Sequence, residues 1–294
     1  MDSGSLRRTA RMSEIEAAGL VRDGMTISLG SNYPLAITRQ IIRRGVKNLT
    51  VMANGGGWDL DLMIAAGCVK KVVGYYFGGG IETIGLFFRR AAQEGEIEVF
   101  ELDEGMLMAG LMAAAQMLPF LPWRGGVGTS FTDLNPELKL FQDPLRRETL
   151  LAVPALKPDI AFLRVSWADD YGQAQFLDSG FSDSAHYRAA DKTIVQAERI
   201  VSNEEIRRNP SRTAIIGAAG VVHAPLGSHP FDCAGFYLAD QTHLREYQAA
   251  ARAWLEKDDR RPITEYLAKY VYEPETHLDY LNTMPAKQLF SLYA

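Results

Sequence analysis

The residues best suited to chemistry are two adjacent carboxylates, Asp103 and Glu104, in the segment FELDEGML that spans residues 100–107. The apolar run before them predicts a strand, and the pattern after them predicts a helix. A carboxylate at the start of a helix is stabilised by the helix dipole and by free backbone N–H groups. In a closed pocket such a group acts as a general base or a nucleophile. Helix capping is the alternative interpretation of both side chains.

Small and amide side chains follow two other apolar runs, as GSN at residues 30–32 and NGGG at residues 54–57. Backbone N–H groups exposed at a strand end stabilise the oxyanion of a tetrahedral intermediate. An ordinary turn between strand and helix is the alternative at both places. The candidates for substrate contact at these two turns are Ser31, Asn32, Asn54, Gly55 and Gly56.

Several common kinds of site are not expected. No glycine pattern of the form GxGxxG joins a strand to a helix, which argues against nicotinamide dinucleotide binding. The GxSxG pattern of serine hydrolases is absent, and His229, in GSHP, is expected to be structural, with loop ordering or a partner contact as the alternative. Cys68 and Cys233 are expected to be buried free thiols, and we expect no metal site.

The elements that must position these residues alternate between short apolar runs and helical patterns in the first half of the chain. This alternation predicts an α/β fold with a mostly parallel open sheet and helices on both faces. Since the candidate residues follow the predicted strands, they should gather at the carboxyl edge of the sheet, where ligands bind in such folds. The predicted strands are residues 25–29, 49–52, 69–77 and 97–102, and the predicted helices are residues 35–44, 60–66, 82–94 and 106–117.

The second half begins with a polar stretch, residues 129–148, that is expected to form a long loop or a lid. From Gln241 the pattern turns helical, and Pro262 is expected to open another short helix. We therefore divide the chain into an α/β domain, residues 12–240, and a helical C-terminal appendage, residues 241–294. The strands predicted between these segments are residues 150–153, 160–167, 193–196 and 214–223.

The composition is that of a globular protein. The 294 residues are 47% hydrophobic, and the formal net charge of -5 shows no basic excess of the kind that nucleic-acid binding needs. No signal peptide and no apolar stretch long enough to cross a bilayer is evident, so we expect no membrane association and a cytoplasmic location.

Seven segments, taken together, resemble the α-type subunits of class I coenzyme A (CoA) transferases, of the glutaconate CoA-transferase kind. The resemblance implies the fold of that family, a CoA thioester as substrate, no permanently bound cofactor, and a β-type partner subunit. It also implies a glutamate, normally on the β-type subunit, that attacks the acyl-CoA to give an acyl-glutamyl anhydride and then a glutamyl-CoA thioester. The segments are DGMTI (23–27), KNLTV (47–51), AGCVKKV (66–72), GLMAAA (110–115), LPFLP (118–122), LAVPALKPD (151–159) and APLGSHP (224–230).

The segment that contains Glu104 is closer to a subgroup of this fold. It resembles the heterodimeric hydrolases that open a ring in the CoA thioesters of steroid catabolism, in which the glutamate of an Asp-Glu-Gly-Met segment does the chemistry. Carried over, this role falls on Glu104. Arg124, which follows Pro122-Trp123, is a further candidate to meet an acidic acyl group or the CoA phosphates, and an ordinary ion pair is its alternative.

Three hypotheses follow for the function. The first is the α-type subunit of a heteromeric CoA transferase, and the second is a CoA-thioester hydrolase that cleaves a C–C bond of a cyclic ketone with Glu104. The third is a non-catalytic subunit that shapes its partner's site. The acyl group is not predicted, because acyl specificity depends on the shape of a pocket to which the partner contributes.

Overall fold

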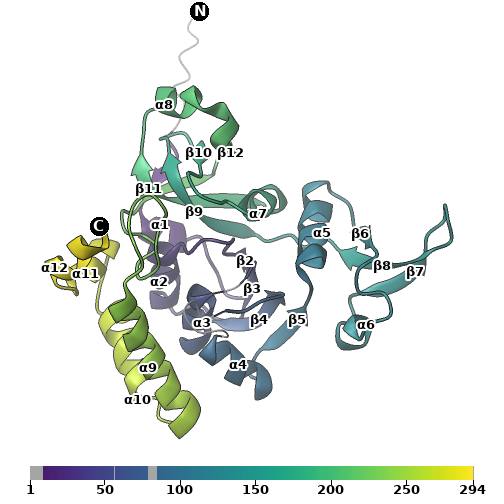
Figure 1. Ribbon diagram of the computed structural model, residues 1–294, viewed down its shortest axis with the longest axis horizontal. Coiled ribbons are helices and arrows are strands. Elements are labelled where there is room, and N and C mark those ends of the chain that lie inside the picture. Colours follow the sequence, from purple (N-terminus) through teal and green to yellow (C-terminus); the bar gives the residue numbers. More distant parts are fainter. Residues whose placement is uncertain (1–8, 56, 79–84, 294) are drawn as a thin grey trace, which may run out of the picture.

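The computed structural model describes residues 9–55, 57–78 and 85–293. The described strands form a large, mostly parallel sheet and a small antiparallel one (Figure 1). The strands are β1 (Arg11–Met12), β2 (Thr26–Ser28), β3 (Leu49–Ala53), β4 (Val69–Gly74), β5 (Glu98–Glu101), β6 (Phe120–Trp123), β7 (Lys139–Gln142), β8 (Thr149–Pro154), β9 (Ile160–Ala168), β10 (Ala174–Gln175), β11 (Lys192–Ile200), β12 (Thr213–Ile215) and β13 (Gly220–His223).

The helices connect and cover these strands. They are α1 (Glu14–Ala18), α2 (Leu35–Arg43), α3 (Trp58–Ala65), α4 (Leu86–Gln93), α5 (Glu104–Ala115), α6 (Phe131–Leu134), α7 (Asp183–Ala189), α8 (Asn203–Arg208), α9 (Gln241–Lys257), α10 (Arg261–Leu267), α11 (His277–Asn282) and α12 (Ala286–Phe290), with short turns η1 (Pro210–Arg212), η2 (Ala268–Tyr272) and η3 (Ser291–Tyr293).

The main path of the large sheet has the order β1-β13-β11-β9-β2-β3-β4-β5, and every neighbouring pair along it is parallel. From β2 the chain adds strands in one direction as far as β5, and it then returns to add β9 on the other side of β2. The order therefore reverses between β2 and β9. In an open α/β sheet this reversal opens a crevice at the carboxyl ends of the strands, where ligands bind.

Alternate residues of the strands face two different layers of helices. Val51 and Val72 belong to a large apolar cluster with α2, α3, α4 and the C-terminal helices, whereas their neighbours Met52 and Val73 belong to a second cluster with α5. Successive side chains of a strand point to opposite faces, so burial of both sets means that helices cover both faces. The predicted fold class is confirmed.

Residues 129–148 are more ordered than the predicted long loop. They contain α6 and β7, and β7 pairs with β8, which also pairs with β6, in the order β6-β8-β7. The sequence analysis predicted β8 as residues 150–153 but missed β7, because this sheet projects from the body of the molecule (Figure 1) and three of the four residues of β7 are exposed. Strands exposed in this way lack the apolar run that marks a buried strand.

Two further boundaries differ from the predictions. The run predicted as one strand, residues 214–223, is divided into β12 and β13, and β12 pairs antiparallel with β10. The strand predicted to reach residue 77 ends at Gly74. The helix predicted from residue 82 includes α4, and residues 79–84 lie outside the described part of the chain.

The C-terminal helices pack on the helices of the sheet through aromatic side chains. Trp254 of α9 stacks on Phe87 of α4, with ring centroids 4.6 Å apart. The hydroxyl of Tyr247 donates to the buried Asp61 of α3 at 2.6 Å. These side chains share one apolar cluster with the sheet, so α9 and α10 are part of its core.

His229 has the structural place expected of it. Its ring is buried and forms hydrogen bonds with the Tyr280 hydroxyl at 2.7 Å and with Asp240 at 3.0 Å. These contacts tie the segment before α9 to α11. Burial lowers the pKa of His229 against the opposing effect of Asp240.

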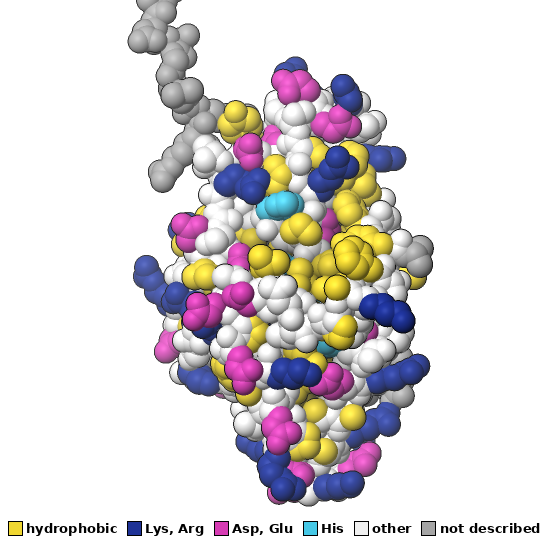
Figure 2. Space-filling view, turned by 90° about the vertical axis from the view of Figure 1, so that its left-hand side faces the viewer, with side chains coloured by type: hydrophobic (Ala, Val, Ile, Leu, Met, Phe, Trp, Pro, Cys, Tyr) yellow, Lys and Arg dark blue, Asp and Glu magenta, His cyan; other side chains and the backbone are white. Residues whose placement is uncertain are grey.

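Figure 2 shows the face on the side of α11 and α12, where hydrophobic side chains lie between scattered charges. Cys68 and Cys233 are buried free thiols, as predicted. Within the described residues, no helix is both long and apolar enough to span a bilayer.

Candidate active site

The candidate residues from the first two strands lie together at the carboxyl edge of the sheet. β2 and β3 are parallel neighbours, so the loops that follow them leave the sheet side by side. The Asn54 amide contacts the Ser31 hydroxyl at 3.1 Å. Asn54 is 5% exposed, whereas Ser31 and Asn32 are half-buried. Gly55 has a left-handed backbone with a φ of 64°, which glycine adopts without strain, and Gly56 lies outside the described residues.

A segment on the other side of the order reversal completes this cluster. The Ser182 hydroxyl lies 2.8 Å from the Ser31 hydroxyl, and it also contacts the Asn54 amide. Asp183, at the start of α7, accepts the Ser31 backbone N–H at 2.7 Å and the Asn32 side chain at 2.8 Å. The Ser31 N–H is therefore already bonded, which removes it as the oxyanion donor expected at this turn.

Asp183 is fully buried, and burial raises its pKa to about 7 despite these two donors. Beside it, the buried Arg164 guanidinium donates to the Asn32 side-chain oxygen and to Asp178, each at 2.8 Å. Cys233 accepts from the same guanidinium at 3.2 Å. The polar cluster thus continues from the sheet edge into the interior. Through Asp183 and Arg164 it forms hydrogen bonds with the loop after β2.

Asp103 and Glu104 divide the two roles that the sequence left open. Asp103 is the N-cap of α5, since its side chain accepts the Met106 backbone N–H at 2.6 Å. Glu104 is the first residue of the helix and is exposed. Capping thus accounts for Asp103 and leaves the Glu104 carboxylate available for other contacts.

Two aromatic side chains, Trp123 and Tyr75, lie near the exposed start of α5. The Trp123 ring lies against Gly105, where a Cβ would come 2.3 Å from the ring. Tyr75 follows β4, the strand paired with β5, and burial together with the Glu104 charge raises the pKa of the Tyr75 phenol. Glu104 thus lies at the same sheet edge as Asn54, at the start of the helix that follows β5, the third strand from β2.

Arg124 follows β6 of the small sheet, between Trp123, whose ring lies against Gly105, and Gly125, which lies close to the Asp103 carboxylate. It is exposed, and its guanidinium pairs with Glu148 with an N–O distance of 3.1 Å. The arrangement is the ordinary ion pair that was its alternative interpretation.

Ser182, Asp183 and Arg164 were missed by the sequence analysis. A weak signal was present, because polar and small residues, interrupted only by Phe181, lead into the start of α7 at Asp183, between two predicted strands. The contacts of Ser182 and Asp183 with Ser31 join residues about 150 positions apart, which a pattern along the chain does not reveal.

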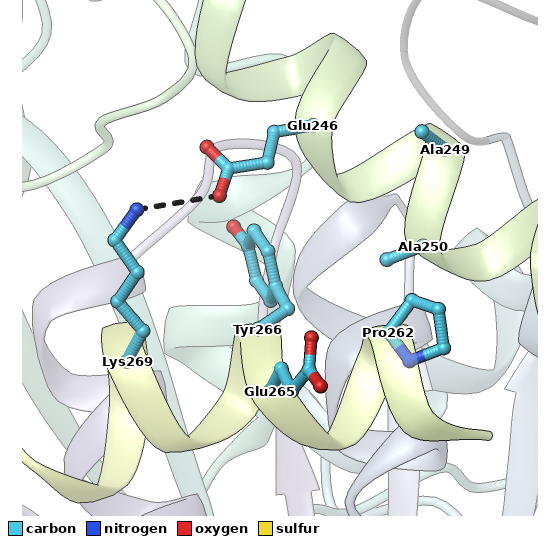
Figure 3. A pocket seen from close by; sticks show the side chains of 7 residues that line it. All are labelled: Glu246, Ala249, Ala250, Pro262, Glu265, Tyr266 and Lys269. Atoms are coloured by element: carbon cyan, nitrogen blue, oxygen red, sulfur yellow. Dashed lines mark hydrogen bonds and ion pairs between the residues drawn. The ribbon is translucent and has the colours of Figure 1, made fainter.

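A cavity of about 450 Å³ lies elsewhere, between α9 and the segment of α10 and η2 (Figure 3). Glu246 and Lys269 form an ion pair of 3.4 Å on one side of it, and Ala249, Ala250 and Pro262 line the other. Its lining contains none of the candidate site residues. Within the described residues, no group of three or more His, Cys, Asp and Glu side chains is placed to hold a metal ion.

The sheet order and the polar edge can be compared with known proteins. The family model described as coenzyme A transferase matches residues 11–218. The chain belongs to the coenzyme A transferase family. The resemblance found in its sequence is thereby confirmed.

Within the family, the chain is of the α type. It is 29% identical over 298 residues to the A subunit of glutaconate CoA-transferase from Acidaminococcus fermentans, covering 94% of this chain and 91% of that relative. The crystal structure of that enzyme superposes with a TM-score of 0.90 at 28% identity, covering 97% of this chain and 96% of the other.

Two other relatives have a higher sequence identity to this chain. It is 36% identical over 270 residues to the IpdA subunit of a cholesterol ring-cleaving hydrolase from Rhodococcus jostii, covering 84% of this chain and 90% of that relative. It is 35% identical over 282 residues to a protein of Archaeoglobus fulgidus, covering 93% of this chain, and it spans 62% of that protein's length.

Proposed function

We propose that this chain is the α-type subunit of a heteromeric enzyme that moves CoA between an acyl-CoA and a carboxylic acid. A β-type subunit would supply the glutamate that forms the glutamyl-CoA thioester. The observation that carries the proposal is the carboxyl edge of the sheet, where Ser31, Asn54 and Glu104 gather while Glu104 stays exposed. An edge with polar groups and an exposed Glu104 suits half of a site that a second subunit closes.

The proposed roles follow from this placement. Ser31, Asn32, Asn54, Gly55 and Gly56 contact the substrate. Arg124 meets an acidic acyl group or the CoA phosphates, for which it must leave Glu148. The acyl-CoA is a substrate, and no permanently bound cofactor is required. Two buried free thiols support a reducing, cytoplasmic location.

A second candidate function is favoured by one specific observation. Because Asp103 caps α5, Glu104 is not needed as a cap and remains free to act as a general base. This geometry suits a hydrolase that adds water across a C–C bond of a cyclic ketone acyl-CoA, as in the ring-cleaving relatives. The third candidate, a subunit that only shapes its partner's site, gives Glu104 no chemical role.

The test is to co-express the chain with a β-type partner and to incubate the complex with an acyl-CoA, with and without an acceptor carboxylate. Mass spectrometry follows the CoA. Transfer only in the presence of the acceptor, with hydroxylamine converting a glutamyl-CoA on the partner to a glutamyl hydroxamate and free CoA, supports the transferase. Gain of water with CoA still attached supports the hydrolase instead.

Glu104→Gln separates the three candidates further. It should lower hydrolysis by about 10²–10⁴-fold, the usual contribution of a general base. It should lower CoA transfer less, and it should leave the complex of a purely supporting subunit nearly unchanged. Glu101→Gln, an exposed glutamate at the end of β5, is the matched control.

A further inference from the structure

We propose that Trp123 is a positioning residue, whose ring holds the first turn of α5 and thereby the carboxylate of Glu104 at the carboxyl edge of the sheet. The inference rests on the proposed function, because it takes Glu104 as a group that meets the acyl-CoA. It also gives the small sheet a part in the site, since Trp123 is the last residue of β6.

The strand β6 reaches the start of α5 because the chain folds back on itself after the helix. α5 ends at Ala115 and β6 begins at Phe120, and the two elements lie side by side (Figure 1). Trp123, at the far end of the strand, pairs with Leu151 of β8 and packs against the apolar cluster that contains Met106 of α5. The end of β6 is thus anchored to both the small sheet and the helix.

The Trp123 ring lies directly against the backbone at two glycines. At Gly105, in the first turn of α5, a Cβ would come 2.3 Å from Cζ2 of the ring, and at Gly125 a Cβ would come 2.6 Å from its Nε1. In a close-packed interior any larger residue at either position would displace the ring or the backbone. Glycine at both positions therefore lets the ring lie on the start of the helix.

Packing places this ring, and hydrogen bonding does not. The indole N–H of Trp123 is buried and donates to no described group. A buried N–H without an acceptor costs free energy, which an apolar ring of the same shape would avoid. The contact area of the ring on the helix is therefore what matters at this position, and phenylalanine should supply part of it.

Glu104 depends on this contact because its own side chain is not held by others. It is exposed and forms no hydrogen bond or ion pair with another described residue. Its position is therefore set by the backbone of the first turn, which is held by the Asp103 cap and by the ring of Trp123. A displacement of about 1 Å can cost a reacting group about 100-fold in rate, so the ring affects catalysis without touching the substrate.

The experiment uses the complex with its β-type partner and a double-mutant cycle between the two side chains. kcat and KM are measured with the acyl-CoA that the complex converts. Trp123→Ala should lower kcat about tenfold and change KM by less than about twofold, because Glu104 is displaced while the rest of the edge stays in place. In the Glu104→Gln background the same change should alter kcat by less than about twofold.

Three other variants complete the test. Trp123→Phe should recover at least about half of the parent kcat. Gly105→Ala should lower kcat as Trp123→Ala does, because its Cβ displaces the ring although alanine favours the helix, and it replaces Trp123→Ala if that variant does not fold. Phe120→Ala, at the other end of β6, is the control and should keep the parent kcat.

An equal loss of kcat in the parent and in the Glu104→Gln background would overturn the inference, because Trp123 would then act independently of Glu104. A rise in KM at unchanged kcat would also overturn it, since the ring would then be a substrate contact. Parent activity in Glu104→Gln would instead contradict the role proposed for Glu104.

Discussion

At the scale of single residues, Asp103 and Glu104 show how neighbouring carboxylates acquire different roles. Asp103 turns its side chain back to the first turn of α5, whereas Glu104 points away from the helix start and stays exposed. Asp103 fixes the residue at which α5 begins, and the start of α5 in turn fixes the position of Glu104.

Asp103→Ala should lower the free energy of unfolding by about 1 kcal/mol, the usual effect of losing an N-cap. Glu104→Ala should change it by less than about 0.5 kcal/mol, because Glu104 is exposed and does not cap. Urea denaturation of both variants measures the difference, with Asp133→Ala as the control for an aspartate in the first turn of another helix. A larger loss for Glu104→Ala would mean that the capping role had been assigned to the wrong residue.

Asp183 gives a prediction for pH. Burial raises its pKa from 3.8 in the unfolded chain to about 7, so the folded protein binds its proton more tightly. The stabilisation is complete below pH 3.8 and is lost as the pH rises to 7. Asparagine does not titrate, so Asp183→Asn does not lose stability through this group as the pH rises. The free energy of unfolding of the variant minus that of the parent should therefore rise between pH 5 and 7.

The slope expected for Asp183→Asn is at most about 1.4 kcal/mol per pH unit. Urea denaturation at several pH values measures it, and Asp133→Asn controls for an exposed carboxylate. A difference that does not vary with pH would mean that Asp183 is ionised throughout this range.

At the scale of elements, α9 bears on the division of the chain into two domains. The boundary at residues 240 and 241 remains a prediction, and helical structure does begin there. Trp254 is 3% exposed, stacks on Phe87 and lies beneath Arg90, whose guanidinium is 4.4 Å from the ring centroid. This packing supports an appendage that folds together with the sheet.

Trp254→Ala should lower the free energy of unfolding by about 3–5 kcal/mol, as for other large residues removed from a core. The transition should stay single, because α9 shares its apolar cluster with α4. Phe290→Ala, at a position that is 74% exposed, is the control and should change stability little. Two separate transitions in the Trp254 variant would show that the C-terminal helices unfold independently.

At the scale of the whole molecule, the small sheet and the C-terminal end of α5 present large apolar side chains that a partner can cover. Met117, which follows α5 at the opposite end from Glu104, is 93% exposed, and Leu145, between β7 and β8, is 90% exposed. Exposed apolar surface of this kind is typical of an interface with another chain.

Addition of a β-type partner should therefore protect the carboxyl edge. We expect backbone amides at residues 30–32 and 102–106 to exchange with deuterium at least about tenfold more slowly in the complex. Mass spectrometry of the free and bound chain measures this, with α8 as a segment expected to stay unchanged. Unchanged exchange at the edge would place the partner on another surface.

Much of the fold follows from the sequence because its signals are local. Apolar runs and helical periodicity predicted the parallel strands and their helices, and Gly45, Gly67 and Gly95 follow α2, α3 and α4 with a positive φ. The family was also evident from short segments spread over most of the chain. Strand β7 escaped because it is mostly exposed and lacks an apolar run. The division between β12 and β13 escaped because it depends on pairing with β10 and β11.

For the candidate site, the sequence alone determined that Ser31, Asn54 and Glu104 follow strands and so share one edge of the sheet. Only the tertiary structure decided that Asp183 takes the Ser31 N–H, that Ser182 holds Asn54, and that Asp103 caps the helix of Glu104. The physical reason is that a strand's end can be predicted from neighbours in the chain, whereas each hydrogen-bond partner is chosen by distance in space.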